Sequence, residues 1–200
     1  MTLSVRQISG EDHLAFLRTQ PSASFLQTPA WAKVKPEWKA ESLGWVRGSG
    51  ADEQIVGVAL VLYRQLPKVK RYLAYLPEGP VIDWAADDLG DWLEPMAAHL
   101  KKQGAFGIRI GPPVVTRRWD GAQIKEGIAD DAVTSLTALA PAVRSQVGAA
   151  VVSQLRELGW VCQSVEGGFA AGQPQYNFQV PLAGPDGPLS EEQVLAQMNQ

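Results

Sequence analysis

Two stretches of the chain decide its predicted fold: residues 31–38, which read WAKVKPEW, and residues 72–83, which read YLAYLPEGPVID. The first is predicted to be a short helix that stops at a proline. The second is predicted to be an apolar strand that stops at a Gly-Pro turn, because aromatic and aliphatic residues alternate along it as in a buried strand. Most of the remaining chain is predicted to support these two pieces.

The short helix has a recognisable start and end. Thr28 is a favourable N-cap, and Pro29 suits the first helical position, where its missing N–H costs nothing. Pro36 is expected to end the helix, because the residue before a proline is driven from the α region toward extended backbone. Lys35 should therefore leave the helix with its ammonium group projecting at a corner.

Lys35 has two interpretations at this corner. Trp31 and Trp38 flank it in the sequence, and an ammonium group between two indoles could bind a phosphate as a compact point charge. Alternatively, Lys33 and Lys35 stand there only because the helix dipole favours cations at a C-terminus. Spacing alone leaves both open.

The end of the strand is the second feature with chemical potential. Gly79 allows a close backbone approach or a positive φ, and Pro80 fixes the exit of the chain. Tyr75, just before this turn, could stack on a base or donate its hydroxyl. The alternative is that Tyr72 and Tyr75 are ordinary sheet residues.

Composition describes an ordinary globular protein. The chain has 200 residues, of which 46% are hydrophobic and 20% charged, and its net charge of −3 gives no general reason to expect nucleic-acid binding. The single cysteine, Cys162, cannot form an internal disulfide, which fits a reducing compartment. Because Cys162 lies in a predicted strand, its thiol is expected to be packed and inert. No signal-peptide core and no apolar run of membrane-spanning length are present, so a cytoplasmic location without an integral membrane segment is expected. Peripheral contact with a substrate at the membrane surface stays open.

Periodicity and capping signals predict the other elements. The fold class is expected to be α/β (α+β): a mixed, mostly antiparallel sheet flanked by helices. Residues 114–135 are expected to be irregular. The predicted strands are residues 4–8, 39–47, 54–66, 72–76, 105–110, 160–165 and 175–180, and the early ones are expected to form an antiparallel meander. The predicted helices are residues 9–17, from 83–88 to about 103, 146–158, and a last one opening at Ser190. Ser9 with Asp12 is expected to cap the first helix, and Ser190 with Gln193 forms a predicted capping box for the last.

Several kinds of chemistry have no motif in this chain. There is no P-loop, no His-Glu-x-x-His and no Cys/His cluster, so neither a metal nor a cofactor is expected. The Gly48-Ser49-Gly50 turn joins two predicted strands rather than a strand and a helix, so it reads as a hairpin and not as a turn that wraps the pyrophosphate of coenzyme A. No convincing candidate for covalent catalysis stands out, and the catalytic residues are left unassigned.

Two groups of basic residues remain. Arg64, Lys68, Lys70 and Arg71 cluster around one loop, and Arg117 and Arg118 precede Trp119. Either group could contact the phosphates of an RNA. The alternative is a solvated hairpin end and a charged loop.

The two opening stretches also carry a resemblance. Residues 25–35 and 75–83 resemble the Fem-type (FemABX) aminoacyltransferases, which build the peptide bridges of peptidoglycan. Three further stretches agree in order and spacing with that family, so the likeness covers most of the chain. They are residues 106–112, 158–160 and 173–180.

The resemblance implies a substrate-binding role for particular residues. Lys35 matches a family lysine that would face the diphosphate of a peptidoglycan precursor, and Tyr75 matches an aromatic residue ahead of the family's Gly-Pro turn. Phe106 stands where the family can have tyrosine, and Arg109 matches an arginine for which a structural ion pair is the alternative. Gly111 stands where the family has aspartate, which removes a carboxylate. The implied substrate-binding set is Lys35, Trp38, Tyr75, Gly79, Phe106 and Arg109.

The resemblance further implies a domain plan and an activity. Residues 1–182 would form a first GNAT-like domain, with residues 171–182 pairing toward a second one, and residues 183–200 would be a linker and the start of that second domain. The implied activity is transfer of an amino acid from aminoacyl-tRNA to the stem peptide of a peptidoglycan precursor, either UDP-MurNAc-pentapeptide or its lipid-linked form. Two alternatives stay open: transfer from another activated acyl donor, such as acyl-CoA, and a non-catalytic precursor-binding module.

Overall fold

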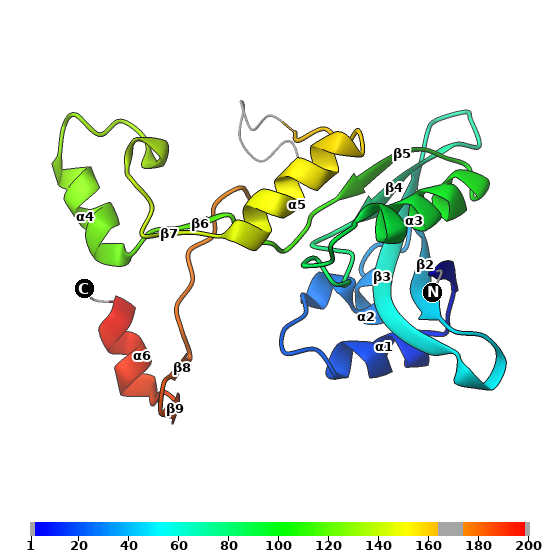
Figure 1. Ribbon diagram of the computed structural model, residues 1–200, viewed down its shortest axis with the longest axis horizontal. Coiled ribbons are helices and arrows are strands. Elements are labelled where there is room, and N and C mark those ends of the chain that lie inside the picture. The colour runs from blue at the N-terminus through cyan, green and yellow to red at the C-terminus, as the bar shows by residue number, and fades with distance from the viewer. Residues whose placement is uncertain (1–2, 164–173, 199–200) are drawn as a thin grey trace. The chain divides into compact units, whose positions relative to one another are not determined.

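The computed structural model describes residues 3–163 and 174–198 (Figure 1). The chain divides into two compact units, Met1–Cys162 and Gln163–Gln200, and each is described by itself. This division does not test the predicted domain boundary after residue 182, which stays a prediction.

A five-stranded sheet is the centre of the first unit, with the strands in the order β1-β2-β3-β4-β5. The first four strands pair antiparallel as a meander, and β5 pairs parallel to β4. The predicted meander and the mostly antiparallel α/β sheet are therefore confirmed. The strands are β1 (Ser4–Gln7), β2 (Lys39–Arg47), β3 (Gln54–Gln65), β4 (Tyr72–Leu76) and β5 (Ala105–Ile110).

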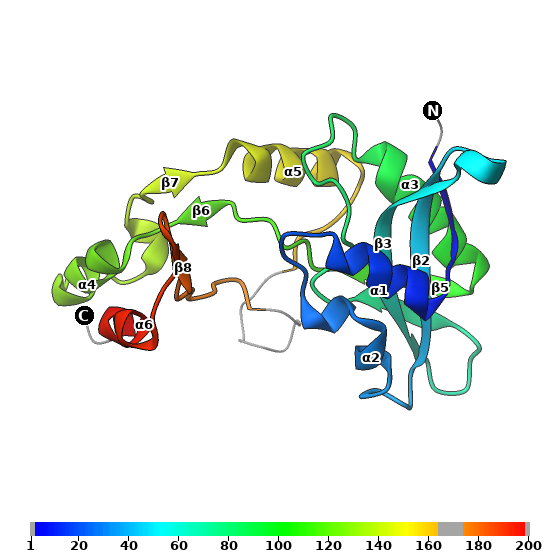
Figure 2. The ribbon, with the colours of Figure 1, turned by 90° about the horizontal axis from the view of Figure 1, so that it is seen from below.

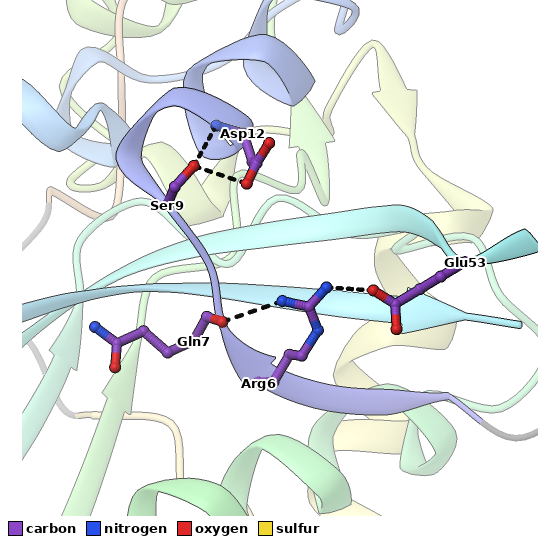
Figure 3. Close-up of polar contacts among 5 residues, drawn as sticks. All are labelled: Arg6, Gln7, Ser9, Asp12 and Glu53. Atoms are coloured by element: carbon purple, nitrogen blue, oxygen red, sulfur yellow. Dashed lines mark hydrogen bonds and ion pairs between the residues drawn. The ribbon is translucent and has the colours of Figure 1, made fainter. Parts of the chain in front are cut away.

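One face of this sheet is covered by the N-terminal helices. They are α1 (Gly10–Arg18), the 3-10 turn η1 (Phe25–Gln27) and α2 (Pro29–Ala32). As predicted, Ser9 caps α1: its Oγ accepts from the backbone N–H of Asp12 at 3.0 Å and donates to the Asp12 carboxylate (Figure 3). The same figure shows Arg6 of β1 in an ion pair with Glu53, at the start of β3, which ties the first strand to the β2–β3 hairpin.

The other face carries the main core under α3 (Gly90–Lys102). Alternate residues of β2, β3 and β4 point into this core, and the buried stripe of α3 packs on them. The indole N–H of Trp45 donates to the carbonyl of Trp92 at 2.7 Å, which joins the sheet to the first turn of α3. Full burial of a leucine contributes about 2 kcal/mol. The buried leucines and methionine of this layer are Leu3, Leu43, Leu76, Leu89, Leu93, Met96 and Leu100.

Shorter elements complete the chain. The first unit adds η2 (Gly50–Asp52), β6 (Arg117–Arg118), α4 (Gly121–Ala129), η3 (Leu136–Ala138), β7 (Val143–Arg144) and α5 (Gln146–Glu157). The second unit holds β8 (Ala183–Gly184), β9 (Gly187–Pro188) and α6 (Glu191–Met198). The predicted capping box between Ser190 and Gln193 is confirmed at the start of α6.

Three secondary-structure predictions were wrong. The segment 114–135 is not irregular throughout, because Asp120 and Gln123 form a capping box that opens α4. Residues 160–163 form no strand, and Cys162, expected to be packed, is exposed; residues 164 and 165 lie outside the described part. Residues 175–180 form no strand either. Apolar alternation needs a neighbouring strand to pair with, and neither segment pairs with a strand of the described residues.

Candidate functional site

Sheet register brings two of the predicted site residues together. Tyr75 of β4 is the direct partner of Arg109 of β5, so their side chains leave the sheet on the same face. Leu62 of β3 is the partner of Tyr75, and Arg64 lies two residues further along the same face. This is the face that α1 and α2 cover over β2 and β3, so Arg64, Tyr75 and Arg109 lie beside those helices.

Trp38 stands over these residues and completes an aromatic and basic group. Its ring lies edge-on to the ring of Tyr75, with centroids 6.5 Å apart and an interplanar angle of 60°. The guanidinium carbon of Arg64 lies 5.8 Å from the centre of the Trp38 ring. An exposed cation–π contact contributes about 0.5–1 kcal/mol, and an aromatic pair a similar amount. We call Trp38, Arg64, Tyr75 and Arg109 the Trp38 cluster.

Lys35 is joined to this cluster by a tight turn. The backbone N–H of Trp38 donates to the carbonyl of Lys35 at 3.0 Å, which closes a four-residue turn over Pro36. The Cα atoms at the two corners of such a turn lie within about 7 Å of each other. The exposed Lys35 therefore starts its side chain next to Trp38.

The helix before Lys35 differs from the predicted one. α2 ends at Ala32, and Lys33, not Lys35, is its C-cap. The backbone then continues in four-residue turns, in which an N–H donates to the carbonyl three residues earlier. One of them is closed by the N–H of Lys35 donating to the carbonyl of Ala32, so Pro36 follows a turn rather than ending an α-helix. The predicted capping of α2 by the Thr28 side chain is also absent, because that hydroxyl donates to the carbonyl of Phe25.

The two indoles do not enclose Lys35. The ring of Trp31 lies edge-on to Phe25, with centroids 5.4 Å apart, while Trp38 turns to Tyr75. Among the contacts of the described residues, Lys35 stacks on neither ring. The surface beside Lys35 is thus formed by Trp38 and the two residues that its ring contacts, Arg64 and Tyr75.

Gln27 was not predicted from the sequence and holds this region together. It is fully buried in η1, its side-chain Nε2 donates to the carbonyl of Pro77 at 2.5 Å, and its Oε1 accepts from the N–H of Leu60 at 2.9 Å. Continuing the β3–β4 register beyond Leu62 and Tyr75 places Leu60 opposite Pro77. Proline has no N–H to give to a ladder, and the side-chain amide of Gln27 bridges the two strands there instead.

Gly79 makes room for this amide. A Cβ at Gly79 would stand 2.4 Å from the side-chain carbon Cδ of Gln27, so only glycine fits. Positive φ occurs at Glu78 (47°), not at Gly79. The carbonyl of Gly79 accepts from the N–H of Gly111 at 3.2 Å, which ties the ends of β4 and β5. The need for glycine here thus comes from packing, and a contact between Gly79 and substrate stays a prediction.

Phe106 lies apart from the Trp38 cluster. In the β4–β5 register, Tyr72 pairs with Ala105 and Leu73 with Gly107, so Phe106 is the extra residue of a bulge. Its side chain is 54% exposed. Lys35, Trp38, Tyr75 and Arg109 gather around one part of the sheet, whereas Phe106 is placed at the start of the edge strand.

Further polar groups are buried on the two faces of the sheet. His13 of α1 is fully buried, and its Nδ1 lies 2.9 Å from Ser42 Oγ, while its Nε2 makes no hydrogen bond to a described residue. Burial lowers the pKa of His13 to about 4, although the backbone of Gln27 partly opposes the shift. On the α3 face, Glu41 accepts from the Tyr63 hydroxyl, and burial, with that carboxylate, raises the pKa of Tyr63 well above its usual value.

Other binding features are few in the described part of the chain. No three His, Cys, Asp or Glu side chains there could hold a metal ion together. A hollow of about 300 Å³ is lined by residues of α4 and by Leu139, and none of the predicted site residues lines it. No described helix combines the length and apolarity needed to span a bilayer.

Comparisons with known proteins agree with the resemblance. Residues 8–200 match the model of the FemAB family. A 110-residue segment is 31% identical to the Lipid II:glycine glycyltransferase of Staphylococcus aureus (strain MRSA252), and it covers 54% of this chain and 25% of that relative. The chain thus matches only about a quarter of the length of the curated relatives.

Solved structures are less similar. The crystal structure of FemX is 29% identical with a TM-score of 0.46, over 56% of this chain and 27% of that one. A ribosomal-protein-alanine N-acetyltransferase from Brucella melitensis biovar Abortus 2308 is 16% identical with a TM-score of 0.36, over 72% of this chain and 100% of that one. Both TM-scores are below 0.5. The family model spans nearly the whole sequence, and on that ground this chain belongs to the FemAB family.

Proposed function

We propose that this chain is the precursor-binding, N-terminal part of an aminoacyltransferase that builds the peptide bridges of peptidoglycan. Family membership supports this proposal, as does the similarity to the staphylococcal Lipid II:glycine glycyltransferase. In the proposed plan, residues 1–182 form the first GNAT-like domain and residues 183–200 lead into a second. The reaction would take place in the cytoplasm.

The proposed reaction sets clear demands. An amine on the stem peptide attacks the ester carbonyl of an aminoacyl-tRNA, and the ester is already activated. Positioning of the two substrates and removal of a proton from the amine are then the main tasks, with support for the developing oxyanion. We assign these chemical tasks to no residue of this chain. Its task in the proposal is to hold the precursor.

The observation that carries the proposal is the meeting of Trp38 and Tyr75 beside three cations. Arg64 lies on the Trp38 ring, Arg109 is the register partner of Tyr75, and Lys35 is one turn away from Trp38. Arginine and lysine bind phosphate through charge-assisted hydrogen bonds. We place the diphosphate of the precursor among these cations and the sugar or base against the exposed aromatic surface.

Arg64 takes a role here that differs from both interpretations that the sequence left open. It was grouped with the loop cations, either as a possible tRNA contact or as part of a solvated hairpin end, but its guanidinium lies over Trp38. Stacking restricts the guanidinium and leaves its N–H edges free to point outward in a fixed plane. In the proposal it binds the precursor, not the tRNA.

The test is a calorimetric titration of the 200-residue chain with UDP-MurNAc-pentapeptide and, separately, with coenzyme A. The proposal predicts binding of the precursor and none of coenzyme A. Binding of coenzyme A alone would contradict it and favour an acyl-CoA-dependent transferase. The chain by itself is expected to transfer no amino acid from aminoacyl-tRNA to the precursor. Turnover in a transfer assay would contradict the proposal that this chain only holds the precursor.

A further inference from the structure

One end of the sheet is strongly basic although the chain as a whole is acidic. Residues 64–72 contain four Lys or Arg residues and residues 99–107 contain two, and neither segment contains Asp or Glu. By contrast the whole chain has 18 basic and 21 acidic residues. Arg64 belongs to the Trp38 cluster. We call the other five exposed cations of the two segments, together with two exposed aliphatic residues, the basic edge. It comprises Lys68, Lys70, Arg71, Lys101, Lys102, Leu66 and Val69.

The two segments lie side by side in the structure. The N–H of Tyr72, at the start of β4, donates to the carbonyl of Gly104, which follows α3, at 3.2 Å. The β3–β4 hairpin and the C-terminal end of α3 are neighbours in both ribbon views (Figures 1 and 2). The hairpin is closed by the N–H of Leu66 donating to the carbonyl of Arg71 at 2.9 Å. The cations of the hairpin and of the helix end therefore share one surface.

These cations are not neutralised within the described chain. All five are exposed, and none of them pairs with a carboxylate of the described residues. Like charges gathered in this way repel each other, and the field they create attracts an anionic surface. The basic edge is thus electrostatically suited to a partner that carries many negative charges.

Two aliphatic side chains stand among the cations. Leu66 is 40% and Val69 51% exposed, at the base and near the tip of the hairpin. A surface that binds single-stranded RNA combines cations with aromatic rings that stack on bases. Phe106 is exposed at this end of the sheet, but Leu66 and Val69, which stand among the cations of the hairpin, cannot stack in that way. At a membrane, cations contact lipid phosphates while aliphatic side chains enter the boundary between headgroups and acyl chains.

We propose that the basic edge docks the protein on an anionic lipid surface. Lys68, Lys70, Arg71, Lys101 and Lys102 contact the headgroup phosphates, and Leu66 and Val69 enter the headgroup boundary. This goes beyond the proposed function and does not need the Trp38 cluster to bind a precursor. If both proposals hold, docking brings the chain to the surface where a lipid-linked precursor lies.

The first test is cosedimentation of the 200-residue chain with vesicles. Vesicles of phosphatidylcholine containing about a third phosphatidylglycerol are expected to bind the chain, and the binding should fall as salt screens the charges. Vesicles of phosphatidylcholine alone are expected to bind it far more weakly. Equal binding to both kinds of vesicle, or no binding to the anionic one, would overturn the proposal.

Two matched double variants locate the binding surface. Each cation near an anionic membrane raises the binding constant by a factor of about five, so the double variant Lys68→Gln with Lys70→Gln should bind about thirtyfold more weakly. Arg18→Gln with Arg47→Gln makes the same change in net charge at exposed positions outside the basic edge and should weaken binding less than about twofold. Equal losses in the two pairs would show that net charge, not this edge, is responsible. Circular dichroism checks that both pairs remain folded.

Variants of the two aliphatic residues distinguish binding to a membrane from binding to RNA. Leu66→Ser with Val69→Ser keeps the backbone bonds of the hairpin and all its charges, and should weaken binding to anionic vesicles about fivefold or more. Binding of unfractionated tRNA to the same variant should not change. A chain that binds tRNA more tightly than vesicles, with vesicle binding unaffected by the serine pair, would overturn the proposal in favour of RNA.

Discussion

The indole ring of Trp38 lies edge-on to the phenol ring of Tyr75, with centroids 6.5 Å apart. Trp38 precedes the first residue of β2, and Tyr75 lies two strands away in the sheet, so this contact fixes the Lys35 turn against β4. The contact therefore makes the segment before β2 one wall of the Trp38 cluster. This wall is what the proposed precursor site requires.

Trp38→Leu should weaken binding of UDP-MurNAc-pentapeptide about five- to fiftyfold. The change removes the ring partner of Tyr75 and the surface on which Arg64 stacks, which together contribute about 1–2.5 kcal/mol. Trp38→Phe keeps a ring at the same place and should retain most of the affinity. The measurement is calorimetric titration of both variants, and a leucine variant that binds as tightly as the phenylalanine variant would exclude a role for the ring.

Gln27→Leu should lower the free energy of unfolding by about 2–5 kcal/mol. The leucine has a similar size but leaves two buried backbone groups, the N–H of Leu60 and the carbonyl of Pro77, without partners, at about 1–3 kcal/mol each. Urea denaturation followed by circular dichroism gives the value. Gln7→Leu, at an exposed position of β1, should change it by no more than about 0.5 kcal/mol. Equal stabilities of the two variants would argue against the bridging role of Gln27.

His13 should make the protein less stable as the pH falls from about 6.5 to about 4. Its pKa is about 4 in the folded chain and 6.5 in the unfolded one, so between these values the unfolded chain binds more protons. Between pH 7 and pH 4.5 the free energy of unfolding should fall by about 2–3 kcal/mol more in the wild type than in His13→Gln. Urea denaturation of both proteins at the two pH values tests this. The same pH dependence in both would show that His13 does not titrate in this way.

Local signals in the sequence predicted much of the first unit. The Ser9 cap, the Gly48-Ser49-Gly50 hairpin and the apolar alternation of Tyr72–Leu76 each depend on neighbouring residues in the chain, and each is found in the structure. α4 was missed although Asp120 and Gln123 carry the capping-box signal, because the segment has few apolar residues in a helical pattern.

The site was only partly predictable for a different reason. The pairing of Tyr75 with Arg109 follows from sheet register, and the meeting of Trp38 with Tyr75 follows from tertiary packing, so neither can be read from spacing. Gln27 looks like any polar residue in the sequence, and its role appears only once Pro77 is seen opposite Leu60. Phe106 was grouped with the site by resemblance, whereas the β4–β5 bulge sets it apart.

Lys35 provides the most direct test of the proposed site, and Lys33 is its matched control. Both are exposed lysines of the same turn, but only Lys35 is closed onto Trp38 by a backbone hydrogen bond. A hydrogen bond to a charged group contributes about 1.5–3 kcal/mol, or about ten- to hundredfold in affinity. UDP-MurNAc-pentapeptide is titrated against the wild type, Lys35→Met and Lys33→Met. The account predicts that Lys35→Met binds at least about tenfold more weakly while Lys33→Met stays within about twofold of the wild type; equal affinity of Lys35→Met and the wild type would contradict it.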